Sequence, residues 1–256
     1  ITKIVDSMIE AGVVKEGGMI AGKLDRRSIN IKLNKHICKV LAVKIARKSF
    51  DVAAFCLDGT LIEQNHIPID ISHGARFAIE QIKKATQAMC NRYLDIMAIG
   101  MAVPGPYMYN EGKIAIMSEF SGWDKIDIRN EFTSEFDLPI IIEHDANAGA
   151  LAEWNGRLNK NGDVLLCFLA SEGIGSGIIS DGVIFRGNDG VAGEVGHMSI
   201  NRHGPKCSCG NYGCLEKYCS AISFVRWVQE DLIHHPESSL NSEPEITPEV
   251  VFKHMK

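Results

Sequence analysis

The sequence lacks the features of several specialised protein classes. Its 256 residues contain no apolar run of about 18 residues, the length that a membrane-spanning helix needs. Residues 1–12 are amphipathic and include acids, which is not the pattern of a signal peptide. The net charge of −5 argues against a surface coated with positive charge for nucleic acid. We therefore expect a globular, non-membrane protein.

The sequence also lacks the cysteine pattern of a secreted or redox-active domain. Disulfide-stabilised domains are shorter and more regularly spaced, and no Cys-x-x-Cys pair begins a predicted helix. Three cysteines lie in apolar, strand-like runs, where a buried free thiol is the usual form: Cys38, Cys56 and Cys167. These observations favour the reducing cytoplasm. Four more cysteines gather between Cys207 and Cys219.

Positive charge is concentrated at the start of the chain. Residues 1–35 hold seven Lys or Arg and four Asp or Glu, a net +3, so the remaining residues carry −8. The pattern predicts a helix at 2–11, a strand at 13–16, a basic glycine-rich loop and a strand at 29–33. This order is typical of the last part of a winged helix-turn-helix, with the loop as the wing. A small helix capping a hairpin fits these residues equally well.

From residue 36 a pattern of strands and helices begins and then repeats. Residues 36–158 predict three strands and a helix at 74–92, then strand, helix, strand and helix, with the last two helices at 123–137 and 146–154. Three strands start again at residue 163, the third at 183–187, so 159–256 reads as a second lobe. A duplicated β-β-β-α-β-α-β-α lobe is the plan of the α/β actin-like ATPase fold, which is ribonuclease H-like.

Both ends of this plan are incomplete. The second lobe has one predicted helix, at 215–232, followed by polar sequence, where a full lobe needs two more strands with their helices. The first segment lacks the two helices that precede a recognition helix in a helix-turn-helix. We therefore expect that the chain is truncated at both ends relative to this plan.

Motifs along nearly the whole chain match one protein family. They are "ITKIVDSMIEAGVVKE", "DRRSINIKLN", "VPGP", "IIIEHDANAGALAEW", "EGIGSGIISDG", "GVAGEVGHMSI" and "CSCGNYGCLE". The most specific is "GEVGH" followed by Cys-x-Cys-Gly-x-x-Gly-Cys-Leu-Glu. On these motifs the chain resembles the ROK family, which groups sugar-responsive repressors and sugar kinases, and in particular its xylose-, N-acetylglucosamine- and glucose-type repressors.

The cysteine cluster predicts a metal site. Zinc prefers four soft or borderline ligands in a tetrahedron, and two glycines in the loop let its backbone fold back. Spacing alone leaves the ligand set open, because Cys-x-Cys is tighter than the usual two-residue spacing. The resemblance implies His197, Cys207, Cys209 and Cys214 as ligands and leaves Cys219 outside. With all four positions filled, the Zn²⁺ would be structural and not catalytic.

The resemblance also implies a sugar pocket beside this metal. In the family, the Glu and His of "GEVGH" and the Glu after the last cysteine contact the sugar, which here are Glu194, His197 and Glu216. One ring nitrogen of His197 would bind zinc while the other meets a hydroxyl, and carboxylates accept hydroxyl hydrogens. Gly105, at a Pro-Gly turn, would let the backbone approach the sugar. Glu194 could instead be a surface acid on a glycine-rich loop.

The "EHDAN" stretch bears on catalysis. Family kinases carry an Asn-Asp pair there, in which Asn holds a hydroxyl and Asp is the general base. This chain keeps Asp145 but has His144 in place of Asn. Asp145 would then be a base or a sugar ligand together with His144. A helix N-cap is compatible with both roles.

No nucleotide-binding residues are expected. Actin-like kinases place a glycine-containing acidic turn between their first two strands, but residues 43–51 have no glycine and carry Lys44 at the acid's position. The second phosphate turn keeps Gly173, Gly175 and Gly177 but has Glu172, which would repel a phosphate. We expect these glycines to serve strand turns.

The basic first segment suggests contact with DNA. Thr2 and Lys3 would lie on a recognition helix, and Arg26 and Arg27 in the wing would enter a minor groove. The family repressors alternate glycine and arginine before this pair, whereas this chain has Lys23 and Asp25, which departs from the pattern. A solvated basic loop is the alternative.

These features favour a cytoplasmic, sugar-responsive transcriptional repressor. Its partners would be operator DNA and a sugar or sugar-phosphate effector, and it would act as a homodimer or homotetramer. The alternative is an ATP-dependent sugar kinase of the same family that uses Asp145 as its base. A third possibility is a DNA-binding head on a lobe that binds another protein through a vestigial sugar site.

Overall fold

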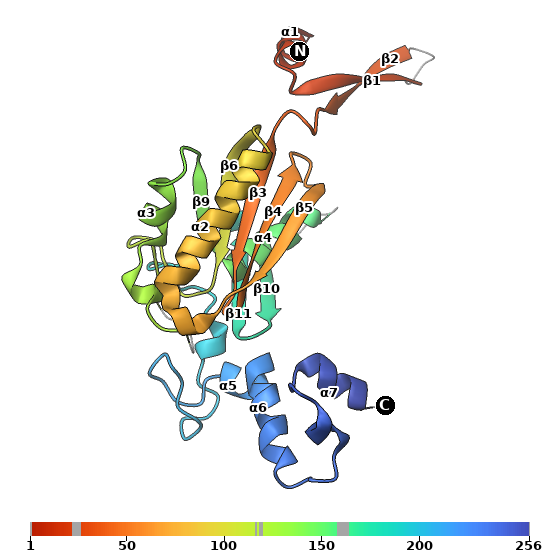
Figure 1. Ribbon diagram of the computed structural model, residues 1–256. Helices are drawn as coiled ribbons and strands as arrows, with labels where there is room; N and C mark the ends of the chain where they lie inside the picture. Colours follow the sequence, from red (N-terminus) through yellow and green to blue (C-terminus); the bar gives the residue numbers. More distant parts are fainter. Residues whose placement is uncertain (1, 22–26, 116, 118–119, 158–163, 256) are drawn as a thin grey trace. The chain divides into compact units, whose positions relative to one another are not determined.

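The computed structural model describes residues 2–21, 27–115, 117, 120–157 and 164–255 (Figure 1). Two compact units make up the chain. The first comprises residues 1–103 and 126–142, and the second comprises residues 104–125 and 143–256. The division at residues 35 and 158 that the sequence suggests stays a prediction.

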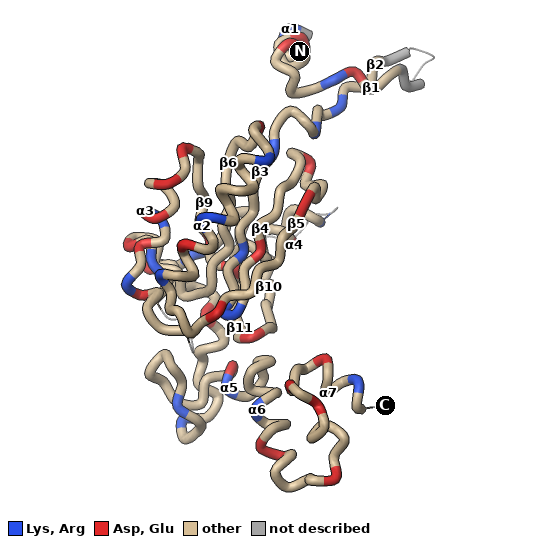
Figure 2. The backbone as a smooth tube through the Cα atoms, viewed as in Figure 1, with Lys and Arg blue, Asp and Glu red and all other residues tan. Residues whose placement is uncertain are grey.

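The first segment is a helix followed by a hairpin, as the sequence predicts. Helix α1 (Thr2–Glu10) is followed by Gly12, whose φ of 72° is the left-handed conformation common after helices. Strands β1 (Val14–Ala21) and β2 (Arg27–Leu33) pair antiparallel with a bulge between Glu16 and Met19. Lys15 and Lys32 are direct cross-strand partners. Figure 2 marks basic residues along both strands and the segment after β2.

A five-stranded mixed sheet forms the core of the first unit. Its order is β5-β4-β3-β6-β9, with β3, β4 and β5 antiparallel and β3 and β6 parallel. The strands are β3 (Lys39–Ile45), β4 (Ser49–Cys56), β5 (Leu61–Pro68), β6 (Ile96–Val103) and β9 (Ile140–His144). Helix α2 (Gly74–Arg92) packs on β3 and β4 through an apolar face that includes Ala78, Ile79 and Ile82.

The predicted helix at 123–137 is wrong in its extent. A 3₁₀ turn, η3 (Trp123–Lys125), comes first, and α3 then covers only Ile128–Thr133. Asp127 separates them because its carboxylate accepts the N–H of Asn130 and so caps α3. Another 3₁₀ turn, η2 (Ile71–His73), precedes α2.

The second unit contains a three-stranded antiparallel sheet covered by one helix. The sheet order is β10-β11-β12, from β10 (Val164–Ala170), β11 (Ile174–Ser180) and β12 (Val183–Ile184). Helix α4 (Asp145–Gly156) packs on it, and Ala150 and Trp154 form a buried cluster with Leu165 and Ile179. The third strand is shorter than predicted. A small hairpin of β7 (Tyr107–Met108) and β8 (Lys113–Ile114) belongs to the same unit.

The predicted helix at 215–232 is two helices. Helix α5 (Glu216–Cys219) stops at Ser220, and α6 (Ala221–Leu232) begins there. Ser220 caps α6 by accepting the N–H of Ser223 at 3.2 Å. The polar sequence beyond holds a 3₁₀ turn, η5 (Ser239–Ser242), and a helix, α7 (Pro248–His254), which the sequence did not predict.

The cysteines follow the expectation from the sequence only in part. All eight cysteines lie in the described ranges, and all are free. Cys56 is buried, whereas Cys38 and Cys167 are half-buried. Within the described part of the chain, no helix is both long and apolar enough to cross a membrane.

Candidate metal and ligand site

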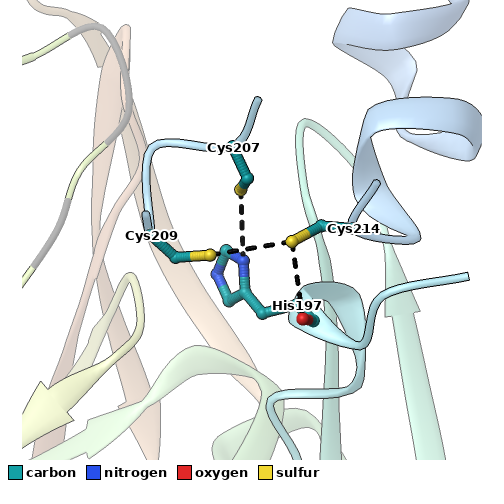
Figure 3. Close-up of side chains that lie close together, drawn as sticks. All are labelled: His197, Cys207, Cys209 and Cys214. Atoms are coloured by element: carbon teal, nitrogen blue, oxygen red, sulfur yellow. Dashed lines mark hydrogen bonds between the residues drawn. The ribbon is translucent and has the colours of Figure 1, made fainter. Parts of the chain in front are cut away.

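Three cysteines and one histidine converge in the second unit. The ligand atoms of His197, Cys207, Cys209 and Cys214 all lie within 4.8 Å of one another (Figure 3). His197 ends the 3₁₀ turn η4 (Val195–His197), and the cysteines come from the loop before α5. This set of side chains could hold a metal ion.

Backbone geometry brings the cysteines together. Gly210 and Gly213 have φ values of 93° and 63°, which L side chains rarely adopt. The turn closes through bonds from the Gly210 N–H to the Cys207 carbonyl at 3.0 Å and from the Cys207 N–H to the Asn211 carbonyl at 2.8 Å. The loop therefore folds back at its glycines, as the sequence suggests.

The three thiols of the cluster differ in pKa. Burial raises the pKa of Cys214 to about 12, with contributions from the thiols of Cys207 and Cys209. Burial also raises the pKa of Cys207, whereas the N–H of Asn211 and the neighbouring thiols lower that of Cys209 despite its burial. Thiols with raised pKa values are poor nucleophiles, but a bound cation would stabilise them as thiolates.

Two of the distances between these ligand atoms are close to those around a tetrahedral zinc ion. Sulfur ligands of zinc lie about 2.3 Å from the metal, so two of them are separated by roughly 3.8 Å. The Sγ atoms of Cys209 and Cys214 are 3.6 Å apart, and Cys207 Sγ is 3.5 Å from His197 Nδ1. Cys219 is exposed, and its Sγ lies 3.3 Å from the Leu215 carbonyl within α5, outside the cluster.

His197 connects the cluster to two carboxylates, of which Glu216 is buried and Glu194 is half-buried. Its Nδ1 faces Cys207, whereas its Nε2 lies 3.9 Å from Glu194 Oε2. Glu216, the first residue of α5, lies 3.9 Å from His197 Nδ1 and accepts a hydrogen bond from Cys207 Sγ at 3.4 Å. Glu194 is not a surface acid, because its side chain is only 17% exposed. Burial raises the pKa of Glu194, against the opposing effect of the nearby His144 and His197 rings.

His144 and Asp145 lie next to this group. The His144 Nε2 is 3.2 Å from Asp145 Oδ1, and its Nδ1 is 3.7 Å from Glu194 Oε1. Asp145 is the first residue of α4, and His144 occupies the cap position without a side-chain bond. The N-cap role considered for Asp145 is therefore wrong. A carboxylate in the first turn is still favoured by the helix dipole.

Because Gly105 has no side chain, the His144 ring can lie against its backbone. A Cβ atom at Gly105 would lie 2.2 Å from His144 Nε2, closer than any non-bonded atoms approach. The imidazole therefore lies directly on the Gly105 backbone. Close approach of a ligand to Gly105, the reason for which the sequence singled it out, stays a prediction.

Behind His144 lies a hydrogen-bonded network that the sequence did not predict. Glu143 is 8% exposed and accepts bonds from the His144 N–H and from Asn147 Nδ2, each at 3.0 Å. Arg186 donates to Glu143 Oε2 from Nε at 3.2 Å and stacks over the Tyr109 ring at 5.1 Å. This network fixes the backbone that presents His144. The only signal for it in the sequence was a charged residue near the end of an apolar strand.

The glycines of "GIGSG" do not all serve turns. Gly173 lies in the turn after β10, but Gly175 and Gly177 lie inside β11. A Cβ at Gly177 would lie 2.4 Å from the Ala146 carbonyl oxygen, so this glycine lets α4 pack closely on β11. In the first unit, β3 and β4 are joined by residues 46–48, which contain no glycine.

The residues expected to bind DNA lie in the first unit. Lys3 is exposed on α1. Thr2 begins α1 and Arg27 begins β2, but their side chains lie outside the described residues, as does Arg26 altogether. Their roles stay predictions. The residues expected to bind sugar all lie in the second unit, and the contacts above bring together Gly105, His144, Asp145, Glu194, His197 and Glu216.

Comparisons with known proteins give one consistent result. The family model described as "ROK family" matches residues 40–256. The xylose repressor of Caldicellulosiruptor bescii is 29% identical over 264 residues, covering 100% of this chain and 66% of the repressor. The DNA-binding transcriptional dual regulator NagC of Escherichia coli is 29% identical over 84% of this chain and 54% of its own length.

Solved structures of regulators and kinases share the fold. A ROK family transcriptional regulator, a homologue of the E. coli MLC protein, superimposes with a TM-score of 0.73 at 24% identity over 97% of this chain and 63% of its own. A ROK family glucokinase from Streptomyces griseus, in complex with glucose and AMPPNP, gives 0.69 at 24% identity over 78% and 63%. The predicted α/β actin-like fold is confirmed. The chain spans less than two thirds of each of these proteins.

Proposed function

Because this chain belongs to the ROK family, we propose that it is a sugar-responsive transcriptional repressor whose sugar pocket is built on a structural zinc ion. The observation that supports this most directly is the position of His197. It faces the cysteines with Nδ1 and Glu194 with Nε2, so the same ring belongs to the metal cluster and to the carboxylate group.

Zinc would serve here to hold its four ligands in a fixed orientation. Three thiolates and one imidazole fill a tetrahedron, which leaves no open position for catalysis. With Nδ1 bound, the Nε2 of His197 carries the proton and can donate to a ligand oxygen. Glu216 is held at the other end of the loop, on the first turn of α5.

The pocket suits a neutral polyol. Asp145, Glu194 and Glu216 are hydrogen-bond acceptors, which match the hydroxyl donors of a sugar. The same carboxylates would repel a phosphate group, which favours the sugar over the sugar-phosphate as effector. Relatives of this chain are named for different sugars, one as a xylose repressor and another as an N-acetylglucosamine repressor, so the sugar is open.

The helix and hairpin of the first unit would bind operator DNA. Lys15 and Lys32 face each other across the hairpin, an arrangement that costs stability unless an anion lies between or beside them. Phosphates of DNA would supply that anion. The protein would act in the cytoplasm. It would form a homodimer or homotetramer, because two DNA-binding segments are needed to contact two operator half-sites.

Selection of DNA by the protein tests this function. Random duplexes that the zinc-loaded protein retains are enriched and then used in mobility-shift assays with D-xylose, D-glucose or N-acetylglucosamine. The proposal expects one enriched sequence and a shift that one sugar changes. No enrichment, or a shift that no sugar affects, would contradict it.

A sugar kinase is the second candidate. It is supported by Asp145 at the start of α4 and by the fold shared with a glucokinase. The β3–β4 turn argues against kinase activity, because residues 46–48 have no glycine to let the backbone surround a phosphate. Release of ADP from ATP–Mg²⁺ with the same sugars would identify a kinase. A vestigial pocket, the third possibility, would show no heat of sugar binding in calorimetry.

A further inference from the structure

His144 is a buried imidazole enclosed by acidic groups. The residue is 4% exposed, and its ring lies against the backbone of Gly105. Its Nε2 is 3.2 Å from Asp145 Oδ1, whereas its Nδ1 is 3.7 Å from Glu194 Oε1. The ring therefore joins the start of α4 to the loop that carries Glu194.

Two atoms of this arrangement have no hydrogen bond within the described structure. They are His144 Nδ1 and Glu194 Oε1, and both are inaccessible to solvent. Leaving a buried polar atom unpaired costs about 1–3 kcal/mol. Their separation of 3.7 Å is too long for a direct hydrogen bond. One oxygen atom placed beside both could bond to each of them.

Which ligand group can bond to both atoms depends on which of the groups carries a hydrogen to donate. A carboxylate only accepts hydrogen bonds, and a hydroxyl has one hydrogen to donate. If His144 is neutral with its proton on Nε2, its Nδ1 is an acceptor like the ionised Glu194, so a single hydroxyl cannot satisfy both atoms. The other neutral tautomer would turn the Nε2 lone pair toward the Asp145 carboxylate 3.2 Å away, which is repulsive. If His144 is protonated, Nδ1 donates to the hydroxyl oxygen and the hydroxyl donates to Glu194.

We propose that His144 binds the ligand as an imidazolium, with one neutral hydroxyl of the ligand bridging it to Glu194, so that affinity falls when His144 loses its proton. This inference rests on the proposed function, because it assigns a proton state and a ligand group to the same pocket. It also gives a reason for histidine where family kinases have asparagine. Asparagine cannot couple sugar binding to pH.

The groups around the ring favour its charged form. Those facing it are Asp145 on α4, Glu194 before η4 and Glu143 on β9, while Gly105 and Gly175 bring no charge. Burial lowers the pKa of His144, but these three carboxylates outweigh it and raise the pKa above the ordinary value. A raised pKa keeps the imidazolium populated near neutral pH, and the proton is lost as pH rises through that value.

Calorimetric titration across pH tests the inference. D-xylose, D-glucose and N-acetylglucosamine are titrated into the zinc-loaded protein from about pH 5.5 to about pH 8.5, the range that spans histidine titration. The sugar that binds is expected to lose affinity by up to about tenfold per pH unit above the His144 pKa. His144→Asn is expected to bind with an affinity that does not vary in the same range.

A second measurement does not depend on a variant that folds. Nitrogen-15 spectra of histidine-labelled wild-type protein, without sugar, are expected to show one ring that keeps both nitrogens protonated to a higher pH than an ordinary histidine. An unchanged or rising sugar affinity with increasing pH, or the same pH dependence in His144→Asn, would overturn the inference alone. A neutral His144 ring in the sugar-bound protein at neutral pH would also overturn it. No heat with any sugar at any pH would overturn the proposed function together with it.

Discussion

At the scale of single residues, Gly105 and His144 share a space that larger side chains cannot enter. Gly105→Ala would place Cβ within 2.2–2.7 Å of three atoms at the far side of the His144 ring. The ring is buried and cannot move freely, so we expect a loss of about 1–3 kcal/mol in the free energy of unfolding. Sugar affinity should fall as well, because the ring moves away from Glu194. Urea denaturation and calorimetry measure the two effects.

A double variant shows whether the loss comes from this contact. Asn in place of His144 lacks Nε2 and Cε1, the two ring atoms nearest the new Cβ. We therefore expect Gly105→Ala to cost less in a His144→Asn background than in the wild type, a non-additivity typical of residues in contact. Equal costs in both backgrounds would show that the ring does not set the requirement for glycine.

At the scale of elements, the close packing of α4 on β11 depends on Gly177. Gly177→Ala would bring Cβ within 2.4 Å of the Ala146 carbonyl oxygen and 2.6 Å of the Ala150 Cβ, both on α4. Helix and strand must separate, which we expect to lower the free energy of unfolding by about 1–3 kcal/mol. Thermal or urea unfolding measures this change.

Gly149 provides the matched control on the same helix. A Cβ there would meet nothing within 4 Å, and its backbone is helical. Gly149→Ala should therefore stabilise the protein by roughly 0.5–1 kcal/mol, since alanine favours helices. Equal effects of the two substitutions would mean that β11 and α4 do not pack as closely as described.

Most elements could be predicted from the sequence, because strand alternation and helical periodicity are local. The strands of the five-stranded sheet and the helix at 74–92 follow from such patterns. The break at Ser220 could not be predicted, because a serine is also tolerated inside a helix. Its cap is supported by a bond from the Ala221 N–H to the Ser171 carbonyl at 2.9 Å, which depends on the folded chain.

The parts of the candidate site that lie in sequence motifs could be predicted. The parts that depend on packing between residues far apart in the sequence could not. The ligand set of the metal cluster was implied by the family resemblance that the "GEVGH" and cysteine motifs carry, and its four side chains do converge. The pairing of Glu143 with Arg186 joins residues 43 positions apart and has no local signal. The contact between Gly105 and His144 likewise depends on which ring the fold brings onto that turn.

At the scale of the whole molecule, substitution of a hairpin lysine distinguishes an effect on DNA binding from an effect on folding stability. Lys15→Glu would place opposite charges across the hairpin, facing Lys32, and should leave the hairpin as stable or slightly more stable. Affinity for the enriched duplex should nevertheless fall, and the slope of log K against log salt should decrease by about 1 to 2 as one phosphate contact becomes a repulsion. Mobility shifts over a salt series measure this.

Lys84→Glu, the same charge change at an exposed position on α2, is the control. This variant should change the slope of log K against log salt little if the lysines that contact DNA lie in the hairpin. A Lys84 variant that loses as much affinity as the Lys15 variant would show that DNA responds to net charge and not to the hairpin.

The central claim is that one metal ion organises the sugar pocket, and paired cysteine variants test it most directly. Metal content and sugar affinity are measured on the same samples of Cys209→Ser and Cys219→Ser. Cys209 lies in the cluster, so its variant should lose the metal together with sugar affinity on the order of tenfold or more. Cys219 lies outside it, so its variant should keep both. Undiminished sugar binding by a metal-free Cys209→Ser protein would contradict the account.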